Sequence, residues 1–452
     1  MKDKKIEMRV QKASERIKNF KEVELGYNDK EALNEANRCL QCANPRCVKG
    51  CPVGIMIPEF IKYIKEKNIK KAYEVISKSS LLPSICGRVC PQEKQCEKMC
   101  VKGFKSDAIA IGSLERYVAD YARNHHYEDI SKIQKNGKKV AIVGSGPSSL
   151  ACAGDLIKNG FEVTIYEVLH KAGGVLTYGI PEFRLPKKIV EKEVSKLEKL
   201  GVKIICDVPV GNAIKLSKLQ KDYDFVFIGT GAGLPKFMNI PGEEANEVFS
   251  ANELLTRINL MKAYNLDAKT PIKKGKVAYV IGGGNVAMDA VRSLKRFGME
   301  THLMYRRSMD ELPARKMEVN HAIEEGIIFD LLSNPAQILT DDDNHVIGME
   351  VVDMKLGDAD ESGRRSVEEI KNSQHKVKCD MVVMALGTSP NHLAFNDSNI
   401  KLDDRGLIIQ DDSLTSLSNV YAGGDAVTGA ATVILAMEAG RKAAKRIIDS
   451  VR

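Results

Sequence analysis

Cysteines are the residues with the clearest chemistry in this 452-residue chain, because eight of its 11 lie close together in two runs. The spacing is Cys-x2-Cys-x4-Cys-x3-Cys-Pro in the first run and Cys-x3-Cys-Pro-x4-Cys-x3-Cys in the second. Thiolates at these spacings suit iron–sulfur chemistry, and eight of them suit two four-iron clusters. Zinc is the main alternative, although its usual Cys-x2–4-Cys pairs lack the Cys-Pro endings. The runs are Cys39, Cys42, Cys47 and Cys51, then Cys86, Cys90, Cys96 and Cys100.

A first glycine loop, Gly144-Ser145-Gly146-Pro147, follows a short β-branched run at residues 139–143. Glycines at this point allow a tight turn and let the backbone approach a pyrophosphate at a helix N-terminus. Glu167 stands 23 residues after Gly144, at the end of a second expected strand, where a carboxylate can bind ribose hydroxyls. We therefore expect a dinucleotide site here, the alternative being a plain strand-to-helix turn.

A second loop, Gly282-Gly283-Gly284-Asn285-Val286, has the same context but a different ending. Arg306 takes the position of the acidic residue, and Arg307 follows it. Guanidinium groups pair with a 2′-phosphate, which a carboxylate would repel. The pattern indicates NADP(H) rather than NAD(H); the alternative is an exposed basic strand end.

One nucleotide with an acidic ribose partner and one with arginine partners together indicate FAD and NADPH. A strand running into Gly423-Gly424-Asp425 supports the flavin, because Asp425 can bind its ribityl or phosphate groups. We assign no catalytic acid–base pair, since a flavin itself carries the hydride chemistry.

The elements that must position these residues form two βαβ units, one at 139–167 and one at 276–305, which indicate an α/β fold with parallel sheets. Apolar residues at helical spacing predict helices at 57–79 and 109–123, and residues 340–376 read as hairpins and loops. A long amphipathic helix is expected at the C-terminus. We expect a helical domain with two clusters at 1–135, an FAD domain at 136–248 and 388–452, and an NADPH domain at 249–387.

Composition excludes several classes of protein. The net charge of +8 is spread along the chain, which does not favour nucleic acid. No apolar run approaches the length of a membrane span, and the charged start lacks the apolar core of a secretory signal. We therefore expect a cytoplasmic protein.

Several segments resemble those of flavoproteins that bind two dinucleotides. They include Gly144-Ser145-Gly146-Pro147, Lys171-Ala172-Gly173-Gly174 and Ala422-Gly423-Gly424-Asp425, and the stretch Thr177–Pro186 narrows the match. The whole chain resembles the small subunit of NADPH-dependent glutamate synthase. It is equally similar to the large subunit of the electron-bifurcating NADH-dependent ferredoxin:NADP oxidoreductase, also called sulfide dehydrogenase.

This resemblance implies an N-terminal iron–sulfur domain followed by an FAD domain with an inserted NADPH domain. It adds Gly174, Leu176, Arg184 and Thr432 to the cofactor-binding residues. It also implies a crossed ligand arrangement, which leaves Cys86 free; four cysteines per cluster, with Glu115 a surface carboxylate, is the alternative. The implied sets are Cys39, Cys42, Cys47 and Cys100 for one cluster, and Cys51, Cys90, Cys96 and Glu115 for the other.

The resemblance further implies that FAD converts a two-electron hydride into single electrons for the clusters. No acceptor domain is visible in the sequence, so a second redox subunit is expected: a smaller ferredoxin-reductase-like flavoprotein, or the large glutamate synthase subunit, with ferredoxin as a further partner. Of these the bifurcating type is our first expectation. A stand-alone dehydrogenase and a redox sensor are the alternatives from other classes.

Overall fold

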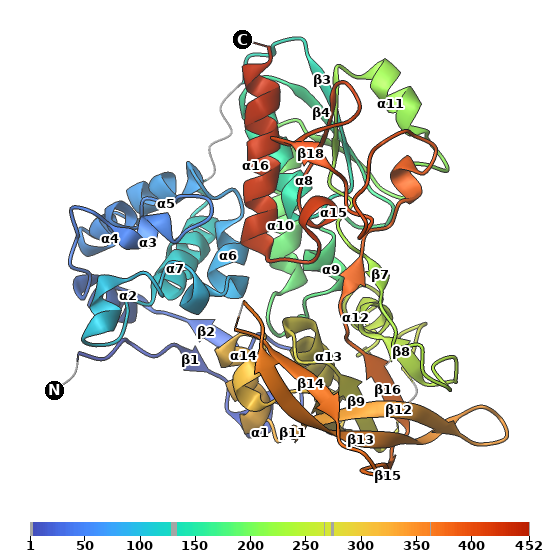
Figure 1. The fold of residues 1–452 in the computed structure, drawn as a ribbon. Helices are drawn as coiled ribbons and strands as arrows, with labels where there is room; N and C mark the ends of the chain where they lie inside the picture. The colour runs from blue at the N-terminus through green and yellow to red at the C-terminus, as the bar shows by residue number, and fades with distance from the viewer. Residues whose placement is uncertain (1–2, 128–132, 266, 273–274, 362, 452) are drawn as a thin grey trace.

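The computed structural model describes residues 3–127, 133–265, 267–272, 275–361 and 363–451 of the chain. Its N-terminal part is mainly helical and lies beside two α/β domains (Figure 1). A short antiparallel pair, β1 (Arg9–Val10) and β2 (Glu24–Gly26), precedes the helices. The helices are α1 (Ala13–Arg16), α2 (Asp29–Asn37), α3 (Arg46–Lys49), α4 (Ile57–Lys65), α5 (Ile69–Ser77), α6 (Pro83–Val89), η1 (Gln92–Lys94), η2 (Val101–Phe104) and α7 (Ile111–Asn124).

The single helix expected at 57–79 is two helices, because the chain turns between α4 and α5. Lys67 adopts a left-handed φ of +57°, which a continuing helix does not allow. Asn68 then caps α5 by accepting a hydrogen bond from the Lys71 N–H. Both helices have their apolar faces inward. The spacing of apolar residues therefore predicted helical structure correctly but did not predict the break between the two helices.

The first α/β domain is a seven-stranded sheet with the order β18-β19-β20-β6-β3-β4-β5. Its five strands from β20 to β5 are parallel and lie between α8 and α16 on one side and loops and α11 on the other. The elements are β3 (Lys139–Val143), α8 (Pro147–Lys158), β4 (Glu162–Tyr166), α9 (Val175–Tyr178), α10 (Lys187–Lys199), β5 (Lys203–Ile205), α11 (Leu216–Asp222), β6 (Phe225–Ile228), η4 (Leu393–Phe395), β18 (Gln410–Asp411), β19 (Leu414–Thr415), β20 (Val420–Ala422), α15 (Asp425–Thr428) and α16 (Val433–Asp449).

The second α/β domain is a five-stranded parallel sheet, β11-β10-β9-β16-β8, joined to a four-stranded antiparallel group of β12 to β15. The described residues between 333 and 378 thus form long hairpins, which agrees with the hairpins and loops expected at 340–376. The elements are β8 (Val248–Ser250), α12 (Ala251–Asn259), β9 (Val277–Ile281), α13 (Asn285–Arg296), β10 (Glu300–Tyr305), η3 (Met309–Glu311), α14 (Lys316–Glu324), β11 (Ile328–Leu331), β12 (Ser333–Thr340), β13 (Val346–Ala359), β14 (Arg365–Glu369), β15 (His375–Lys378) and β16 (Met381–Met384).

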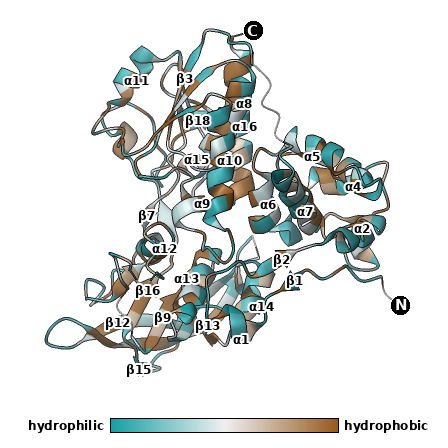
Figure 2. Ribbon diagram, turned by 180° about the vertical axis from the view of Figure 1, so that it is seen from behind, coloured by the Kyte–Doolittle hydropathy of each residue, from teal (hydrophilic) through white to brown (hydrophobic). Residues whose placement is uncertain are grey.

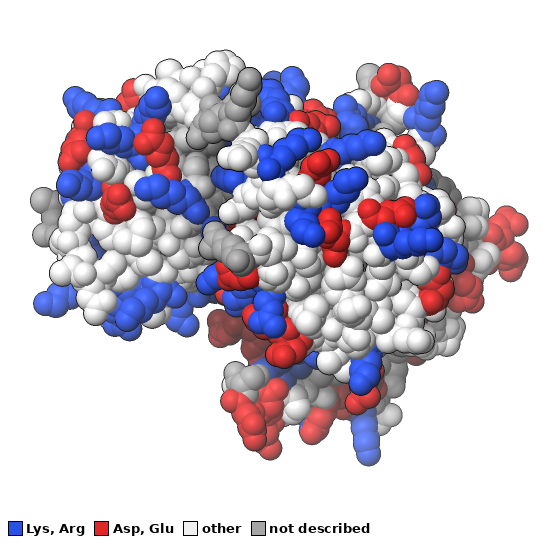
Figure 3. All heavy atoms as spheres, turned by 90° about the horizontal axis from the view of Figure 1, so that it is seen from above, with Lys and Arg blue, Asp and Glu red and all other residues white. Residues whose placement is uncertain are grey.

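Two chain segments cross between the α/β domains and pair with each other as β7 (Leu234–Pro235) and β17 (Thr388–Ser389). In Figure 2 hydrophobic residues concentrate on the sheet strands, and the buried residues of α16 include Ile434, Met437 and Ile447. Lys and Arg are interspersed with Asp and Glu on the face seen in Figure 3, as expected from the even spread of charge. Among the described residues, no helix has the length and apolar character needed to cross a membrane.

Candidate cofactor sites and cysteine groups

The first glycine loop connects β3 to α8 at the carboxyl edge of the seven-stranded sheet. Gly144 has a φ of +90°, and a Cβ there would stand 2.7 Å from the Gly229 carbonyl oxygen. Only glycine fits without moving the backbone. Gly146 is the N-cap of α8, and the position of its absent Cβ is open. The free N–H groups of the first turn of α8 therefore face a space that suits an anion.

Glu167 directly follows β4 and is 4% exposed. One carboxylate oxygen accepts hydrogen bonds from the Ser145 N–H, at 2.9 Å, and from the Ser145 hydroxyl, while the other accepts the Leu169 N–H at 2.8 Å. The carboxylate thus holds the glycine loop in place. A carboxylate has about four acceptor positions, so capacity for one ribose hydroxyl is left.

The segment around Gly174 lies over the same loop. Gly174 has a φ of +52°, and a Cβ there would stand 2.8 Å from the Cα of Gly146. The Gly173 N–H donates to the Ser145 hydroxyl oxygen at 2.9 Å. Leu176 follows in α9 and is fully buried. The glycine pair therefore permits a close approach of two loops that both belong to the predicted flavin site.

Asp425 begins α15, immediately after Gly424, which has a φ of +70°. Burial raises the pKa of Asp425 to about 6. The hydrogen bond that its carboxylate accepts from the Ala431 N–H lowers the pKa, but by less than burial raises it. Burial, followed by the nearby carboxylates of Glu167 and Asp425, raises the pKa of the Tyr178 phenol to about 12. Tyr178 is therefore within electrostatic range of both predicted flavin carboxylates, although the sequence analysis gave it no role of its own.

Thr432 serves as the N-cap of α16, and its hydroxyl accepts a hydrogen bond from the Leu435 N–H at 3.4 Å. This side chain was expected to contact the cofactor. Its position at a helix start next to Asp425 is compatible with that expectation, while its hydroxyl already has a capping partner.

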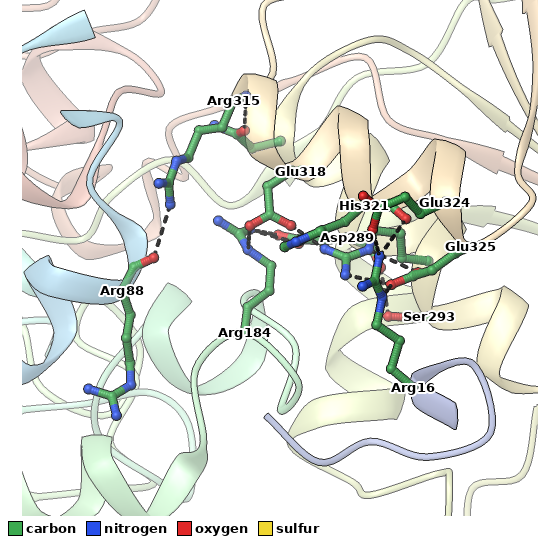
Figure 4. Close-up of polar contacts among 12 residues, drawn as sticks. Arg16, Arg88, Arg184, Asp289, Ser293, Arg315, Glu318, His321, Glu324 and Glu325 are labelled. Carbon is green, nitrogen blue, oxygen red and sulfur yellow. Dashed lines mark hydrogen bonds and ion pairs between the residues drawn. The ribbon is translucent and has the colours of Figure 1, made fainter. Parts of the chain in front are cut away.

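Arg184 has a different environment from the other predicted flavin residues (Figure 4). Its Nη1 lies 2.7 Å from both carboxylate oxygens of Asp289, on α13, and its Nε lies 2.9 Å from Glu318 Oε1, on α14. All three side chains are buried, and together they join the FAD-side segment to the second α/β domain. The guanidinium is therefore occupied by protein carboxylates, an environment that the sequence did not predict.

Lys187 is a second buried cation in this segment. Its Nζ donates to the carbonyl oxygens of Leu176, Ile180 and Leu185, and burial lowers its pKa to about 8. These three bonds fix the shape of residues 176–185. A lysine directly after Pro186 was the available signal, but surface lysines are too common for it to be informative.

The second glycine loop connects β9 to α13. Gly282 has a φ of +139°, and a Cβ there would stand 2.4 Å from the Ala385 carbonyl oxygen. Gly283 packs against the ring of Tyr305, at the end of β10, and Gly284 is the N-cap of α13 with open space around it. Asn285 accepts a hydrogen bond from the Arg315 N–H at 2.9 Å, and Val286 is 42% exposed. This helix start has the same anion-accepting geometry as that of α8.

The two arginines predicted to read the 2′-phosphate are separated by burial. Arg306 is exposed at the end of β10, whereas Arg307 is only 6% exposed. Arg307 donates from its Nε to the Arg365 carbonyl oxygen at 2.8 Å, and its Nη1 is buried without a hydrogen-bond partner among the described residues. Arg306 is therefore the accessible member of the pair.

Cys39, Cys42, Cys47 and Cys100 line one pocket at the surface of the helical domain. Burial raises the pKa of Cys39 and of Cys47, that of Cys47 to about 11, and the neighbouring Cys100 adds to both increases. Thiols in this state keep their protons unless a metal supplies positive charge. These four are the set that the crossed arrangement assigns to one cluster, and their grouping fits it.

The second cysteine group lies deeper, next to Glu115 on α7. Burial raises the pKa of Cys51 to about 11 and that of Cys96 well above its usual range, and Glu115 contributes to both. Hydrogen bonding to Cys86, followed by burial, likewise raises the pKa of Cys90. Cys51, Cys90, Cys96 and Glu115 therefore lie near one another, and Cys86 lies among them.

Glu115 is not a surface carboxylate. It is 6% exposed, burial raises its pKa to about 8, and its Oε1 is buried without a hydrogen-bond partner among the described residues. Cys86 lies beside the same group, 3.5 Å from the Met437 sulfur. Within the described residues no three His, Cys, Asp or Glu side chains converge closely enough for a single metal ion, whereas the ligands of a cubane bind different irons and stand further apart.

Comparison with known families divides the chain into two consecutive parts. Residues 16–127 match the family described as dihydropyrimidine dehydrogenase domain II, 4Fe-4S cluster. Residues 138–440 match the pyridine nucleotide-disulphide oxidoreductase family. An iron–sulfur domain therefore precedes a dinucleotide-binding part, as the sequence predicted.

Relatives match over nearly the whole chain. The glutamate synthase (NADPH) small chain of Halomonas elongata is 35% identical over 447 residues, which cover 97% of this chain and 94% of that one. The Escherichia coli small chain is 34% identical, with 95% and 93% covered. The NADP(+)-dependent formate dehydrogenase subunit beta of Moorella thermoacetica is 37% identical over 90% of this chain and 60% of its own length.

Solved structures support the fold at lower identity. Mycobacterium tuberculosis FprA in complex with NADPH has a TM-score of 0.59 and 19% identity, with 70% of this chain and 84% of that one covered. The thioredoxin reductase of T. acidophilum has a TM-score of 0.51 and 22% identity, over 70% of this chain and 100% of that one. The chain therefore belongs to the pyridine nucleotide-disulphide oxidoreductase family and is an NADP(H)-dependent flavin and iron–sulfur oxidoreductase similar to glutamate synthase small chains.

Proposed function

We propose that this protein is an electron-transfer subunit that passes electrons between NADP(H) and a partner redox subunit through FAD and two 4Fe–4S clusters. The relative positions of the two cysteine groups carry the proposal. The Cys86 sulfur lies 3.5 Å from that of Met437, on α16 of the FAD domain, so the inner group adjoins this domain. The outer group, which includes Cys39 and Cys100, lines a pocket at the protein surface. This order leads from the flavin site to a surface that a partner can reach.

The proposed domains are 1–135 for the clusters, 136–248 and 388–452 for FAD, and 249–387 for NADPH. The outer cluster would be held by Cys39, Cys42, Cys47 and Cys100, and the inner one by Cys51, Cys90, Cys96 and Glu115. The proposed FAD residues are Gly144, Ser145, Gly146, Pro147, Glu167, Gly174, Leu176, Gly424, Asp425 and Thr432. The proposed NADP(H) residues are Gly282, Gly283, Gly284, Asn285, Val286 and Arg306. Arg184, expected in the flavin site, contacts Asp289 and Glu318, and Arg307, expected in the NADP(H) site, contacts the Arg365 carbonyl oxygen.

The chain's own residues bind and orient. The first turns of α8 and α13 offer N–H groups to the two pyrophosphates, and Glu167 holds the first loop while accepting a ribose hydroxyl. When bound, FAD accepts a two-electron hydride and the clusters carry single electrons. Glu115 would supply an oxygen ligand whose negative charge the iron neutralises.

The partner is proposed from the relatives. Two of them are small chains of glutamate synthase, and this chain covers 94% and 93% of their length. The whole-length match favours an assembly with a large glutamate synthase subunit over the electron-bifurcating arrangement with a smaller flavoprotein and ferredoxin. A stand-alone dehydrogenase remains the alternative, and turnover of a small molecule by the single purified chain would identify it.

The test uses protein purified without oxygen. We expect about one FAD and, for two cubanes, about eight irons per chain, with flavin bleaching by NADPH followed by the electron paramagnetic resonance signals of reduced clusters. Cys90→Ser should lose the signals of one cluster, and Cys152→Ser, a buried cysteine outside both groups, should lose none. Bound zinc with negligible iron, or a flavin that NADPH leaves oxidised, would contradict the proposal.

A further inference from the structure

Arg307 and Arg306 are adjacent in sequence but differ in what they can reach. Arg306 is exposed at the carboxyl edge of the NADPH sheet, beside the loop that begins at Gly282. Arg307 is 6% exposed, and its Nε is bonded to the Arg365 carbonyl oxygen. A ligand at the surface can therefore meet the first guanidinium and not the second.

The bond from Arg307 fixes one hairpin of the inserted antiparallel group. Arg365 is the first residue of β14, which pairs with β13 next to α14 (Figure 1). The turn before it is closed by the Asp360 N–H, which donates to the Arg364 carbonyl oxygen at 2.8 Å, and by the Arg364 N–H, which donates to the Asp360 carboxylate at 2.9 Å. Arg364 is thus held at a defined place directly before the residue that Arg307 binds.

That place is near Arg306, because the residues that directly follow Arg306 and Arg364 are joined by the 2.8 Å bond from Arg307 Nε to the Arg365 carbonyl oxygen. Burial, followed by the like charges of Arg307 and Arg364, lowers the pKa of Arg306. Among the described residues, neither Arg306 nor Arg364 has a side-chain hydrogen bond or ion pair, and both are exposed. Two unpaired guanidinium groups held close together repel each other, and an anion between them would relieve that repulsion.

We propose that Arg364, carried by the β13–β14 hairpin, joins Arg306 in binding the 2′-phosphate of NADP(H), and that Arg307 positions this hairpin instead of touching the phosphate. The proposal rests on the proposed NADP(H) site at α13. The 2′-phosphate is then bound by two arginines that are 58 residues apart in the sequence, and not by two neighbouring arginines.

The chemistry of the phosphate fits this arrangement. A phosphomonoester is a dianion with three terminal oxygens, so two guanidinium groups can each bind it through paired N–H donors. The loop at Gly283 packs on Tyr305, which directly precedes Arg306, so the nucleotide loop and the arginines share one edge. NADH lacks this phosphate and gains nothing from either arginine.

Binding of two small probes to the oxidised full-length protein tests the proposal. Adenosine 2′,5′-bisphosphate and adenosine 5′-monophosphate differ only in the 2′-phosphate, and calorimetry gives both affinities. We expect Arg364→Ala to weaken binding of the bisphosphate at least about fivefold, as the loss of a charge-assisted contact implies, and to leave the monophosphate within twofold. Lys371→Ala, which removes an exposed positive charge just after β14, should change neither affinity and controls for net charge.

Arg307→Met separates positioning from direct binding. We expect this substitution to weaken binding of the bisphosphate and to increase hydrogen exchange at residues 363–369. The circular dichroism spectrum of the whole protein should stay unchanged. Weaker binding without increased exchange would mean that Arg307 itself meets the phosphate, which overturns its positioning role.

The outcomes distinguish this inference from the function on which it rests. If Arg306→Ala abolishes the preference for the bisphosphate and Arg364→Ala leaves it intact, the role of Arg364 is wrong and the NADP(H) site stands. If the unmodified protein shows no preference for the bisphosphate, the NADP(H) site at α13 is wrong, and the role of Arg364 with it.

Discussion

Replacement of Arg184 by methionine would test whether this arginine supports the protein or the cofactor. The side chains of Arg184, Asp289 and Glu318 are 7%, 5% and 5% exposed. Glu318 keeps an ion pair with Arg292, but Asp289 has no other ion-pair partner among the described residues. Removing one member of a buried pair costs about 3–5 kcal/mol, because it leaves a buried charge uncompensated. At about 2–4 °C per kcal/mol for a cooperative unit of about 150–250 residues, roughly the size of one α/β domain, the melting temperature of the affected domain should fall by about 10 °C.

The assay is thermal unfolding of the holoprotein, followed by circular dichroism, together with the FAD content. The double variant Arg184→Met with Asp289→Asn removes the stranded charge, so it should recover at least half of the lost melting temperature. FAD content should stay at the level of the unmodified protein in both variants. Loss of FAD at an unchanged melting temperature would refute this reasoning and return Arg184 to the flavin site, and failure of the second substitution to restore stability would refute the charge argument.

Two further outcomes follow from the cysteine groups and from a partly buried histidine. Cys86→Ser should keep the full iron content, whereas Cys90→Ser and Glu115→Ala should each lose one cluster; equal iron loss in the Cys86 and Cys90 variants would favour four cysteines per cluster. Burial lowers the pKa of His302, but hydrogen bonds to two carboxylates outweigh burial and raise it above 6.5. The interaction of protonated His302 with these carboxylates therefore stabilises the fold at low pH and is lost as the pH rises through the raised pKa. His302→Gln should accordingly lower the melting temperature more at pH 6 than at pH 9. An equal effect at both pH values would contradict this.

Short-range patterns were sufficient to predict the α/β architecture. A β-branched run, a glycine loop and a helix follow one another within about 20 residues, so their order in the sequence is their order in space. The same holds for the loop at Gly282 and for the hairpins after residue 333. The break at Lys67 was missed because the apolar spacing on its two sides is nearly in phase, and the left-handed residue that causes it is a lysine and not a glycine.

Long-range partners could not be read in this way. Arg184 and Glu318 are 134 residues apart, and no local pattern connects an arginine in a flavin segment with a helix of another domain. Arg306 and Arg307 look equivalent in sequence and both follow the end of β10 at Tyr305, yet only Arg307 is buried. The environment of Glu115 likewise depends on the packing of α7 against α6, which places a carboxylate where an amphipathic helix was expected to be apolar.

The buried charges gather where three domains meet, and their geometry bears on electron transfer. Arg16, from the N-terminal segment, pairs with Glu325 at 2.8 Å, while the Arg315 guanidinium donates to the Arg88 carbonyl oxygen at 2.9 Å (Figure 4). The Arg315 N–H also binds Asn285, at the start of the NADPH helix. Apolar contacts tolerate sliding, whereas short bonds between charged groups and oxygens accept a narrow range of geometries. Hydride transfer requires reacting atoms about 3–3.5 Å apart, so the junction fixes the nucleotide loop, the flavin segment and the inner cysteine group at set separations.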